Sequence, residues 1–349
     1  MSNICEIDKN FKVETNLNLN DDIYYNVKEN NWCLFGLEFD DRFIRMPKEI
    51  AKKVSKGVLS LHSNTSGGRL RFITDSPYVA LVAQMPDKVN FSHMPQTAIS
   101  GFDLYVGGRF YSAFIPPEQM EDSFSSVVRF RNEAKKNITI NFPLYNNVEN
   151  LYIGLKKGSC FEKAEDYRSG KKIVYYGSSI TQGGCVSRSG LAYPAIISNE
   201  IDCDYINLGF SGSALGEKEM AEYIGRLNPD IFVLDYDHNA PNEEHLRNTH
   251  EAFFKTFRNI CPETPVIIIS APNFKYDYFD WKARREIIKQ TYNNAVSNRD
   301  KNVYFIDGEQ LWGIDNWDSC TVDGTHPNDL GHFKMAKAIL PTIKKIISL

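Results

Sequence analysis

The chain has 349 residues, of which 42% are hydrophobic and 24% are charged, and its formal net charge is -4. This length exceeds what one hydrophobic core usually serves, so we expect two domains. The weakly negative net charge differs from the excess of Lys and Arg that is typical of nucleic-acid-binding proteins. No apolar run approaches the roughly 20 residues of a membrane-spanning helix. We therefore expect no nucleic-acid partner and no membrane association.

Cysteine usage bears on the cellular compartment. The seven cysteines are odd in number and include no Cys-x-x-Cys pair, which argues against both a disulfide framework and a zinc knuckle. The first residues also lack the basic and apolar regions of a signal peptide. A reducing, cytoplasmic location is the expectation that follows.

The first half of the chain, to about residue 158, has the pattern of short strands separated by Gly, Pro and Asp. The strands we predict are 57–62, 70–74, 78–83, 101–106, 124–130 and 137–142. Strands at this spacing predict an antiparallel sandwich of jelly-roll type, which we assign to a domain of residues 1–160. It contains no catalytic constellation, and we expect His62 and His93 to be ordinary sandwich residues.

A charged linker over residues 156–172 leads to a region where strands and helices alternate. The strands we predict are 173–176, 205–208, 231–235, 266–270 and 303–306. The helices we predict are 193–200, 217–226, 243–260, 281–296 and 330–339, the last one bent or ended near Pro341. This rhythm predicts a second domain over 171–349, an α/β fold with a doubly wound, flavodoxin-like parallel sheet.

Polar residues follow the first strand of this sheet. Ile173-Val-Tyr-Tyr runs into Gly177 and then Ser178-Ser179. In open α/β sheets the carboxyl ends of the strands are where ligands and catalytic groups gather. A serine there is a candidate nucleophile only if a base and an oxyanion hole come from elsewhere, and otherwise this is an ordinary strand-to-helix turn.

Three later loops supply such partners. The second strand is followed by Asn207-Leu-Gly-Phe-Ser-Gly212, and the third ends in Asp235-Tyr-Asp-His-Asn-Ala-Pro241. After the fifth strand comes Asp323-Gly-Thr-His326-Pro. Together with Gly-Ser-Ser-Ile, these motifs in this order resemble the SGNH (GDSL-type) hydrolases, over roughly residues 171–349. Gly101-Phe-Asp-Leu-Tyr105 is similar to the GxDLY signature of the β-domain that precedes some of these hydrolases.

The resemblance implies a role for five residues. Ser179 is the nucleophile, and His326 is the general base that Asp323 orients. The oxyanion hole is formed by backbone N–H groups of Ser179 and Gly212 and by the Asn239 side chain. The roles are chemically consistent, because a serine hydroxyl needs an imidazole to take its proton and a carboxylate to hold that imidazole in the right tautomer.

Two departures from the family pattern concern the oxyanion pocket. Ser178 stands where the family has Asp, and Asp237-His238-Asn239-Ala240 replaces Gly-x-Asn-Asp. Neither change removes an atom that the chemistry requires.

Each motif also has a structural alternative. Asp323 and His326 could form only a loop ion pair, Asn239 could cap a turn, and Gly212 could serve a tight bend. His238 is a candidate substrate contact or a surface histidine, and Trp317 either stacks on a sugar or packs its loop. The Asp235 loop opens like a calcium loop but lacks that motif's glycine and bidentate glutamate, so we expect no metal there.

These observations predict a serine esterase that acts through an acyl-enzyme without metal or cofactor. The resemblance implies an O-acetylated small molecule or oligosaccharide as the ester substrate. An acyltransferase is the close alternative, because the same acyl-enzyme can pass its acyl group to an alcohol. A carbohydrate-binding protein with a vestigial hydrolase site is the alternative of a different class.

Overall fold

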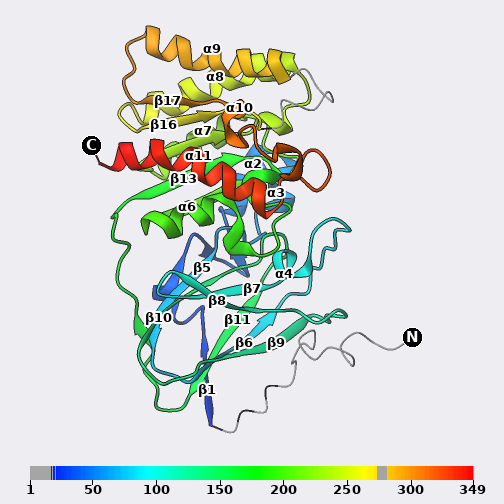
Figure 1. Ribbon diagram of the computed structural model, residues 1–349, viewed down its shortest axis with the longest axis vertical. Coiled ribbons are helices and arrows are strands. Elements are labelled where there is room, and N and C mark those ends of the chain that lie inside the picture. The colour runs from blue at the N-terminus through cyan, green and yellow to red at the C-terminus, as the bar shows by residue number, and fades with distance from the viewer. Residues whose placement is uncertain (1–16, 18, 20, 273–280, 349) are drawn as a thin grey trace.

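The computed structural model describes residues 17, 19, 21–272 and 281–348. A β-rich N-terminal region lies at one end of the elongated molecule, and a parallel sheet flanked by helices lies at the other (Figure 1).

Two antiparallel sheets make up the N-terminal region. The first has the order β1 (Asp22–Asn26), β11 (Asn150–Lys156), β6 (Tyr78–Gln84) and β9 (Ser123–Arg129). The second has the order β12 (Glu162–Lys163), β5 (Arg69–Thr74), β10 (Lys136–Asn141), β7 (Phe102–Val106) and β8 (Arg109–Phe114), with β2 (Leu34–Phe35) paired to β5. The predicted antiparallel β region is therefore confirmed.

Alternation of side chains explains how the two sheets form one core. Along β9, Phe124, Ser126 and Val128 are buried while their neighbours are more exposed, as the two-residue period of a strand requires. Residues from both sheets, among them Phe72 and Leu81, belong to one cluster of buried apolar side chains.

The predicted strand at 57–62 is wrong. These residues lie largely in helix α3 (Lys56–Leu61), which follows α2 (Lys48–Val54). Ser55 caps α3, since its hydroxyl accepts a hydrogen bond from the Val58 N–H at 3.1 Å. Val58 is buried in the core of the α/β region, and this tertiary contact overrides the β propensity of the local sequence. His62, at the C-terminal end of α3, contacts the Leu59 carbonyl through Nδ1.

The second region contains five parallel strands, as the sequence predicts. Their order is β14 (Asp204–Gly209), β13 (Lys172–Gly177), β15 (Ile231–Asp235), β16 (Val266–Ile269) and β17 (Val303–Ile306). Numbered along the chain this is 2-1-3-4-5, the flavodoxin-like order, so the predicted fold class is confirmed.

Helices cover both faces of this sheet (Figure 1). Helices α7 (Lys218–Arg226), α8 (Glu243–Ile260) and α9 (Trp281–Ser297) contribute to the core on one face. Helices α6 (Tyr193–Ile201) and α11 (Asp329–Ile347) contribute to the core on the other. Along β13, Val174 and Tyr176 belong to the first core while Ile173 and Tyr175 belong to the second.

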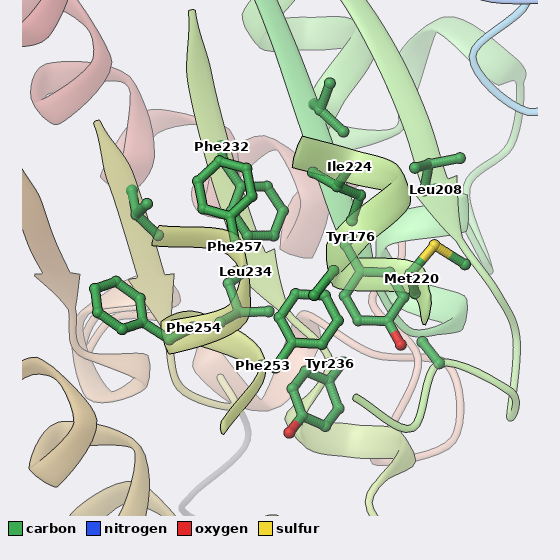
Figure 2. Packing of buried hydrophobic residues seen from close by; sticks show 14 of the residues in the cluster. Tyr176, Leu208, Met220, Ile224, Phe232, Leu234, Tyr236, Phe253, Phe254 and Phe257 are labelled. Atoms are coloured by element: carbon green, nitrogen blue, oxygen red, sulfur yellow. The ribbon is translucent and has the colours of Figure 1, made fainter. Parts of the chain in front are cut away.

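Aromatic packing dominates the core beneath α8 (Figure 2). The Tyr176 and Phe253 rings are stacked with centroids 4.9 Å apart, and the Phe232 and Phe257 centroids are 4.6 Å apart. The Tyr176 hydroxyl donates to Glu217 at 2.7 Å, so its polar end is satisfied.

The final helix does not end at Pro341. Helix α11 begins after Asn328, whose side chain accepts a hydrogen bond from the Gly331 N–H, and it continues through Pro341 to Ile347. Pro341 lies on the exposed side of the helix, while Ile339, Leu340 and Ile343 are buried. The carbonyl that loses its backbone donor can therefore be solvated, and packing of the apolar face maintains the helix.

No helix within the described ranges has the length and hydrophobicity needed to span a bilayer. The six cysteines that the structure describes are all free thiols. The cytoplasmic location stays a prediction.

Candidate active site

The predicted nucleophile lies at the carboxyl end of β13. Ser178 caps the short helix α5 (Ser179–Gln182), because its hydroxyl accepts the Ile180 N–H at 3.2 Å. A Cβ on Gly177 would lie 2.0 Å from the Thr181 hydroxyl oxygen and 2.4 Å from the Asp235 carbonyl oxygen. Only glycine lets the strand pass this close to the helix that presents Ser179.

The structure brings Ser179, His326 and Asp323 together. The Ser179 Oγ lies 3.0 Å from His326 Nε2, and His326 Nδ1 lies 2.7 Å from an Asp323 carboxylate oxygen. The second carboxylate oxygen of Asp323 accepts the backbone N–H groups of Thr325 and His326 at 2.9 and 2.7 Å. Ser179 and His326 are 147 residues apart in the chain, so only the fold places them in contact.

Hydrogen bonds keep the Asp323 carboxylate ionised. Burial raises its pKa, but the hydrogen bonds from the His326 ring and from two backbone N–H groups outweigh burial and lower the pKa of Asp323 below its ordinary value. An ionised Asp323 accepts a hydrogen bond from the Nδ1–H of His326. This leaves the Nε2 lone pair free to accept the Ser179 hydroxyl proton.

The three predicted oxyanion donors each have an N–H group that is not used within the described part of the protein. Among the described residues, the N–H groups of Ser179 and Gly212 have no hydrogen-bond partner. Asn239, in the 3-10 helix η4 (Asp237–Asn239), uses one N–H of its amide to donate to the Phe210 carbonyl at 2.8 Å. Its second N–H remains for a ligand. Gly212 has φ +64°, a conformation that favours glycine.

A buried polar network holds the Gly212 loop against α5. The Asn207 side chain donates to the Thr181 carbonyl at 2.7 Å and accepts the Gly209 N–H at 2.8 Å. The Gln182 side chain accepts the Ser211 N–H at 3.0 Å. The loop that contains Gly212 is thus held against α5, the helix that begins at Ser179.

An ion pair that the sequence does not reveal holds the Asn239 loop. The Arg284 guanidinium on α9 contacts the Asp237 carboxylate at 2.9 Å and donates to the Ala240 carbonyl at 3.0 Å. Asp237 also accepts the Ala271 N–H at 3.0 Å. Asp237 is 1% exposed and Arg284 is 4% exposed. The partners are 47 residues apart, and no local pattern marks an arginine within a helix as a loop anchor.

His238 and Trp317 have different surroundings. Burial, followed by the charges of Arg284 and His326, lowers the pKa of His238 to about 3, so its ring is neutral. Its Nε2 is buried without a partner among the described residues, and its ring packs 5.1 Å from Trp281. Trp317 packs against the core cluster that includes Trp312, which agrees with the packing alternative for this residue.

His93 lies beside the candidate base, which the sequence analysis did not predict. It was expected to be an ordinary sandwich residue, but it lies between β6 and α4 (Gln96–Ile99), is exposed, and has its ring centroid 5.7 Å from that of His326. No motif marks it, because its neighbour in space is more than two hundred residues away in the chain.

A hollow of about 410 Å³ lies beside these two histidines. Its lining comes from both regions of the chain and consists of His93, Pro95, Cys185, Ser187, Val322, Asn328, Asp329 and Leu330. The N-terminal region therefore contributes one wall of the space next to the candidate triad.

The GxDLY motif binds the loop that follows α5. The Asp103 carboxylate is fully buried and accepts Arg188 Nη1 at 2.9 Å, the Gly190 N–H at 2.8 Å and the Asn141 amide at 2.7 Å. The Arg188 guanidinium also donates to the Tyr105 hydroxyl at 2.5 Å. The acidic and aromatic members of the motif thus hold one arginine of the hydrolase region.

The same loop supports the segment that carries His326. The Ser187 N–H and hydroxyl donate to the Asp329 carboxylate at 2.7 and 2.6 Å, and the Cys185 N–H donates to the Pro327 carbonyl at 3.1 Å. Asp103 is therefore linked through residues 184–190 to the backbone next to the candidate base.

Comparisons with known families agree with both regions. Residues 170–344 match the model of the GDSL-like lipase/acylhydrolase family. Residues 23–161 match the GxDLY model, described as the N-terminus of esterases of the SGNH hydrolase type. No match was found among curated proteins.

Solved structures share the whole architecture. A Bacteroides ovatus protein described as a GDSL-like lipase is 31% identical with a TM-score of 0.85, and the match covers 94% of this chain and 98% of that one. The salicylyl-acyltransferase SsfX3 of a tetracycline biosynthetic pathway is 21% identical with a TM-score of 0.77, covering 93% and 97%. A family two carbohydrate esterase from Cellvibrio japonicus is 13% identical with a TM-score of 0.61, covering 94% and 98%.

Proposed function

The chain belongs to the GDSL-like lipase/acylhydrolase family, and from this premise we propose that it hydrolyses esters through an acyl-enzyme formed on Ser179. The observation that carries the proposal is the hydrogen-bonded series from Ser179 Oγ to His326 Nε2 and from His326 Nδ1 to Asp323, with distances of 3.0 and 2.7 Å. Such a series is the arrangement that nucleophilic acyl transfer requires.

In the first half-reaction, Ser179 Oγ attacks the ester carbonyl carbon while its proton passes to His326 Nε2. The carbonyl π electrons move to oxygen, and the N–H groups of Ser179, Gly212 and Asn239 donate to the resulting oxyanion. Loss of one such donor costs about 3–4 kcal/mol of transition-state stabilisation in other enzymes. When the C–O bond breaks, the imidazolium returns its proton to the leaving alcohol.

In the second half-reaction, water takes the place of the alcohol. His326 removes a proton from the water as its oxygen attacks the acyl carbon, and the imidazolium then protonates Ser179 Oγ as the acid leaves. His326 and Asp323 have side chains 26% and 37% exposed. This access favours water as the acceptor and therefore hydrolysis over transfer to a second alcohol.

We propose an O-acetylated saccharide as the substrate class. The hollow of about 410 Å³ beside His93 has room for a monosaccharide, and the exposed His93 ring offers hydrogen-bonding nitrogens at its wall. Among the structures that share the fold are the carbohydrate esterase described above and an acetyl xylan esterase from Butyrivibrio proteoclasticus, 13% identical.

The test combines labelling with product analysis. A fluorophosphonate probe should label Ser179 in the wild-type protein and leave the Ser179→Ala variant unlabelled, whereas a vestigial binding protein would not react. Mass spectrometry of acetylated oligosaccharides and aryl esters after incubation should show loss of acetyl groups. Acetyl appearing on an added sugar alcohol instead of in free acetate would show an acyltransferase.

A further inference from the structure

Three side chains with metal-binding atoms converge beside Ser179. They are His93 from the N-terminal region, Cys185 from the loop after α5, and His326. Their ligand atoms, one from each residue, all lie within 4.8 Å of one another. In the described part of the chain this is the only group of three or more His, Cys, Asp or Glu side chains that meets this distance.

The donor set indicates which ion would bind. Two imidazoles and a thiol are borderline-soft ligands that suit Zn²⁺, whereas Mg²⁺ and Ca²⁺ require oxygen ligands. Donors around a tetrahedral zinc lie about 3.5 Å apart, as follows from zinc–ligand bonds of about 2.0–2.3 Å. The donors here must therefore approach by about 1 Å, and the exposed His93 can do so by rotation of its side chain.

One ring nitrogen of His326 already contacts a carboxylate. Zinc-binding histidines usually donate their other ring N–H to a carboxylate, which sets the tautomer and makes the ligating nitrogen more basic. His326 has this arrangement, since Nδ1 lies 2.7 Å from Asp323. Nε2, which contacts Ser179 Oγ at 3.0 Å, is then the nitrogen that a metal would bind.

We propose that His93, Cys185 and His326 form an inhibitory Zn²⁺ site, in which the metal occupies the imidazole nitrogen that ester hydrolysis needs. Zinc coordination uses the Nε2 lone pair, so that nitrogen can no longer accept the Ser179 proton. Binding releases the Cys185 thiol proton to solvent and changes no oxidation state. The inhibition is therefore reversed when a chelator removes the metal.

The first experiment measures binding without activity. Co²⁺ is added to the inactive Ser179→Ala protein, which keeps all three ligands, and absorbance is recorded. We expect one Co²⁺ per chain and a thiolate-to-cobalt charge-transfer band in the near ultraviolet. The band should be lost when Cys185→Ser is added to Ser179→Ala, and retained with Cys160→Ser, which removes a partly exposed thiol outside the site. Absence of the band in the parent protein would overturn the proposal.

The second experiment measures inhibition of aryl acetate hydrolysis by Zn²⁺, with each variant compared with its own zinc-free rate. Loss of an outer-shell partner already costs roughly 10–100-fold in zinc affinity elsewhere, so loss of a ligand should cost at least about tenfold. His93→Ala and Cys185→Ser should therefore raise the half-inhibiting Zn²⁺ concentration by about tenfold or more, and His62→Ala should not. EDTA should restore the wild-type rate.

The outcomes separate this inference from the proposed function. If Zn²⁺ inhibits His93→Ala and Cys185→Ser as strongly as wild type, or activates the enzyme, the inhibitory site is refuted even if Ser179 is essential. If Ser179→Ala remains active, the proposed mechanism fails, while the cobalt spectrum still tests the metal site. His93 is exposed, so its substitution should leave the fold intact.

Discussion

At the scale of single residues, the position of each hydroxyl on α5 determines its role. Ser178 and Ser179 are adjacent and chemically identical, but Ser178 Oγ accepts the Ile180 N–H while Ser179 Oγ contacts His326. Ser178 is thus a helix cap and Ser179 is the candidate nucleophile. The pair provides a matched control within one loop.

We expect Ser179→Ala to lower kcat by about 10⁴-fold or more, because the acyl-enzyme can no longer form. Ser178→Ala should cost about 1 kcal/mol of stability through loss of the cap and much less activity. Steady-state kinetics with an aryl acetate and urea unfolding of both variants make the comparison. A larger loss of kcat in Ser178→Ala than in Ser179→Ala would show that Ser178, and not Ser179, is the nucleophile.

The ionisation of Asp323 determines the pH profile. Its lowered pKa keeps it charged across the range where imidazoles titrate, so the acid-side fall of kcat/KM should follow the uptake of a single proton. A plot of log kcat/KM against pH measures this, and an acid limb with a slope of two would contradict it.

Asp323→Asn should lower kcat by about 10⁴-fold, as loss of the orienting carboxylate does in other triads.

At the scale of elements, the strand ends and the loop after α5 hold the reacting groups. Asp235, at the end of β15, accepts hydrogen bonds from the Thr181 hydroxyl at 3.1 Å and the Tyr193 hydroxyl at 2.9 Å. It thereby joins β15 to α6 and to α5, the helix that carries the candidate nucleophile. The Asp103–Arg188 contact joins β7 to the loop that supports His326.

Asp235 should make stability depend on pH. Burial raises its pKa to about 7, above its unfolded value of about 3.9. Its contribution to stability is therefore fully present below about pH 4 and is lost as pH rises to about 7, by at most about 4 kcal/mol. Asp235→Asn has no such titration, so wild type should lose stability relative to the variant over this range. Urea unfolding at several pH values measures this, and parallel curves for the two proteins would refute it.

Asp103 should influence catalysis from outside the site. Asp103→Asn leaves Arg188 without its buried carboxylate, which typically costs about 3–5 kcal/mol of stability. We expect kcat and the rate of phosphonate labelling at Ser179 to fall together while KM changes little, because the His326 segment loses its support. Asn141→Ala is the control, since Asn141 contacts the same carboxylate but not Arg188. If the folded Asp103→Asn protein labels at the wild-type rate, the motif serves stability alone.

At the scale of the whole molecule, the two regions are not independent in packing. Met46, Ala51 and Val58 belong to the core of the α/β region. Leu144 and Tyr145 form a further cluster with Cys185 and Val186 of the loop after α5. Arg45 is 3% exposed and donates to the Leu61 carbonyl at 2.8 Å and to the Gly209 carbonyl of β14.

A chain that starts at Glu162 should therefore not fold alone. It would expose the apolar surface that α2 and α3 cover on the α/β region, together with the Leu144 contact of the α5 loop. We expect aggregation on size-exclusion chromatography and no cooperative thermal transition. A monodisperse truncated protein that hydrolyses aryl acetates at the full-length rate would show that the N-terminal region is dispensable for folding and chemistry.

The sequence by itself determined the features that depend on local pattern. Alternating apolar residues and turn signals predicted the β region, and buried strands separated by helices predicted the parallel sheet. The motifs at four strand ends also predicted that their loops lie close together, because carboxyl ends of parallel strands lie at one edge, and the contact of Ser179 with His326 agrees with this. The errors were local, such as the helix at 56–61 and the course of α11 beyond Pro341.

Only the tertiary structure decided the contacts between distant segments. It placed His93 beside His326, paired Arg284 with Asp237, and bound Arg188 to Asp103. The GxDLY motif marks Asp103, but no periodic or motif signal pairs the two members of any of these contacts, because each contact arises when separate elements pack together and an otherwise unpaired buried group needs a partner. The same packing turned Gly57-Val-Leu-Ser-Leu into a helix, since its apolar face is buried against the hydrolase region and not within the sandwich.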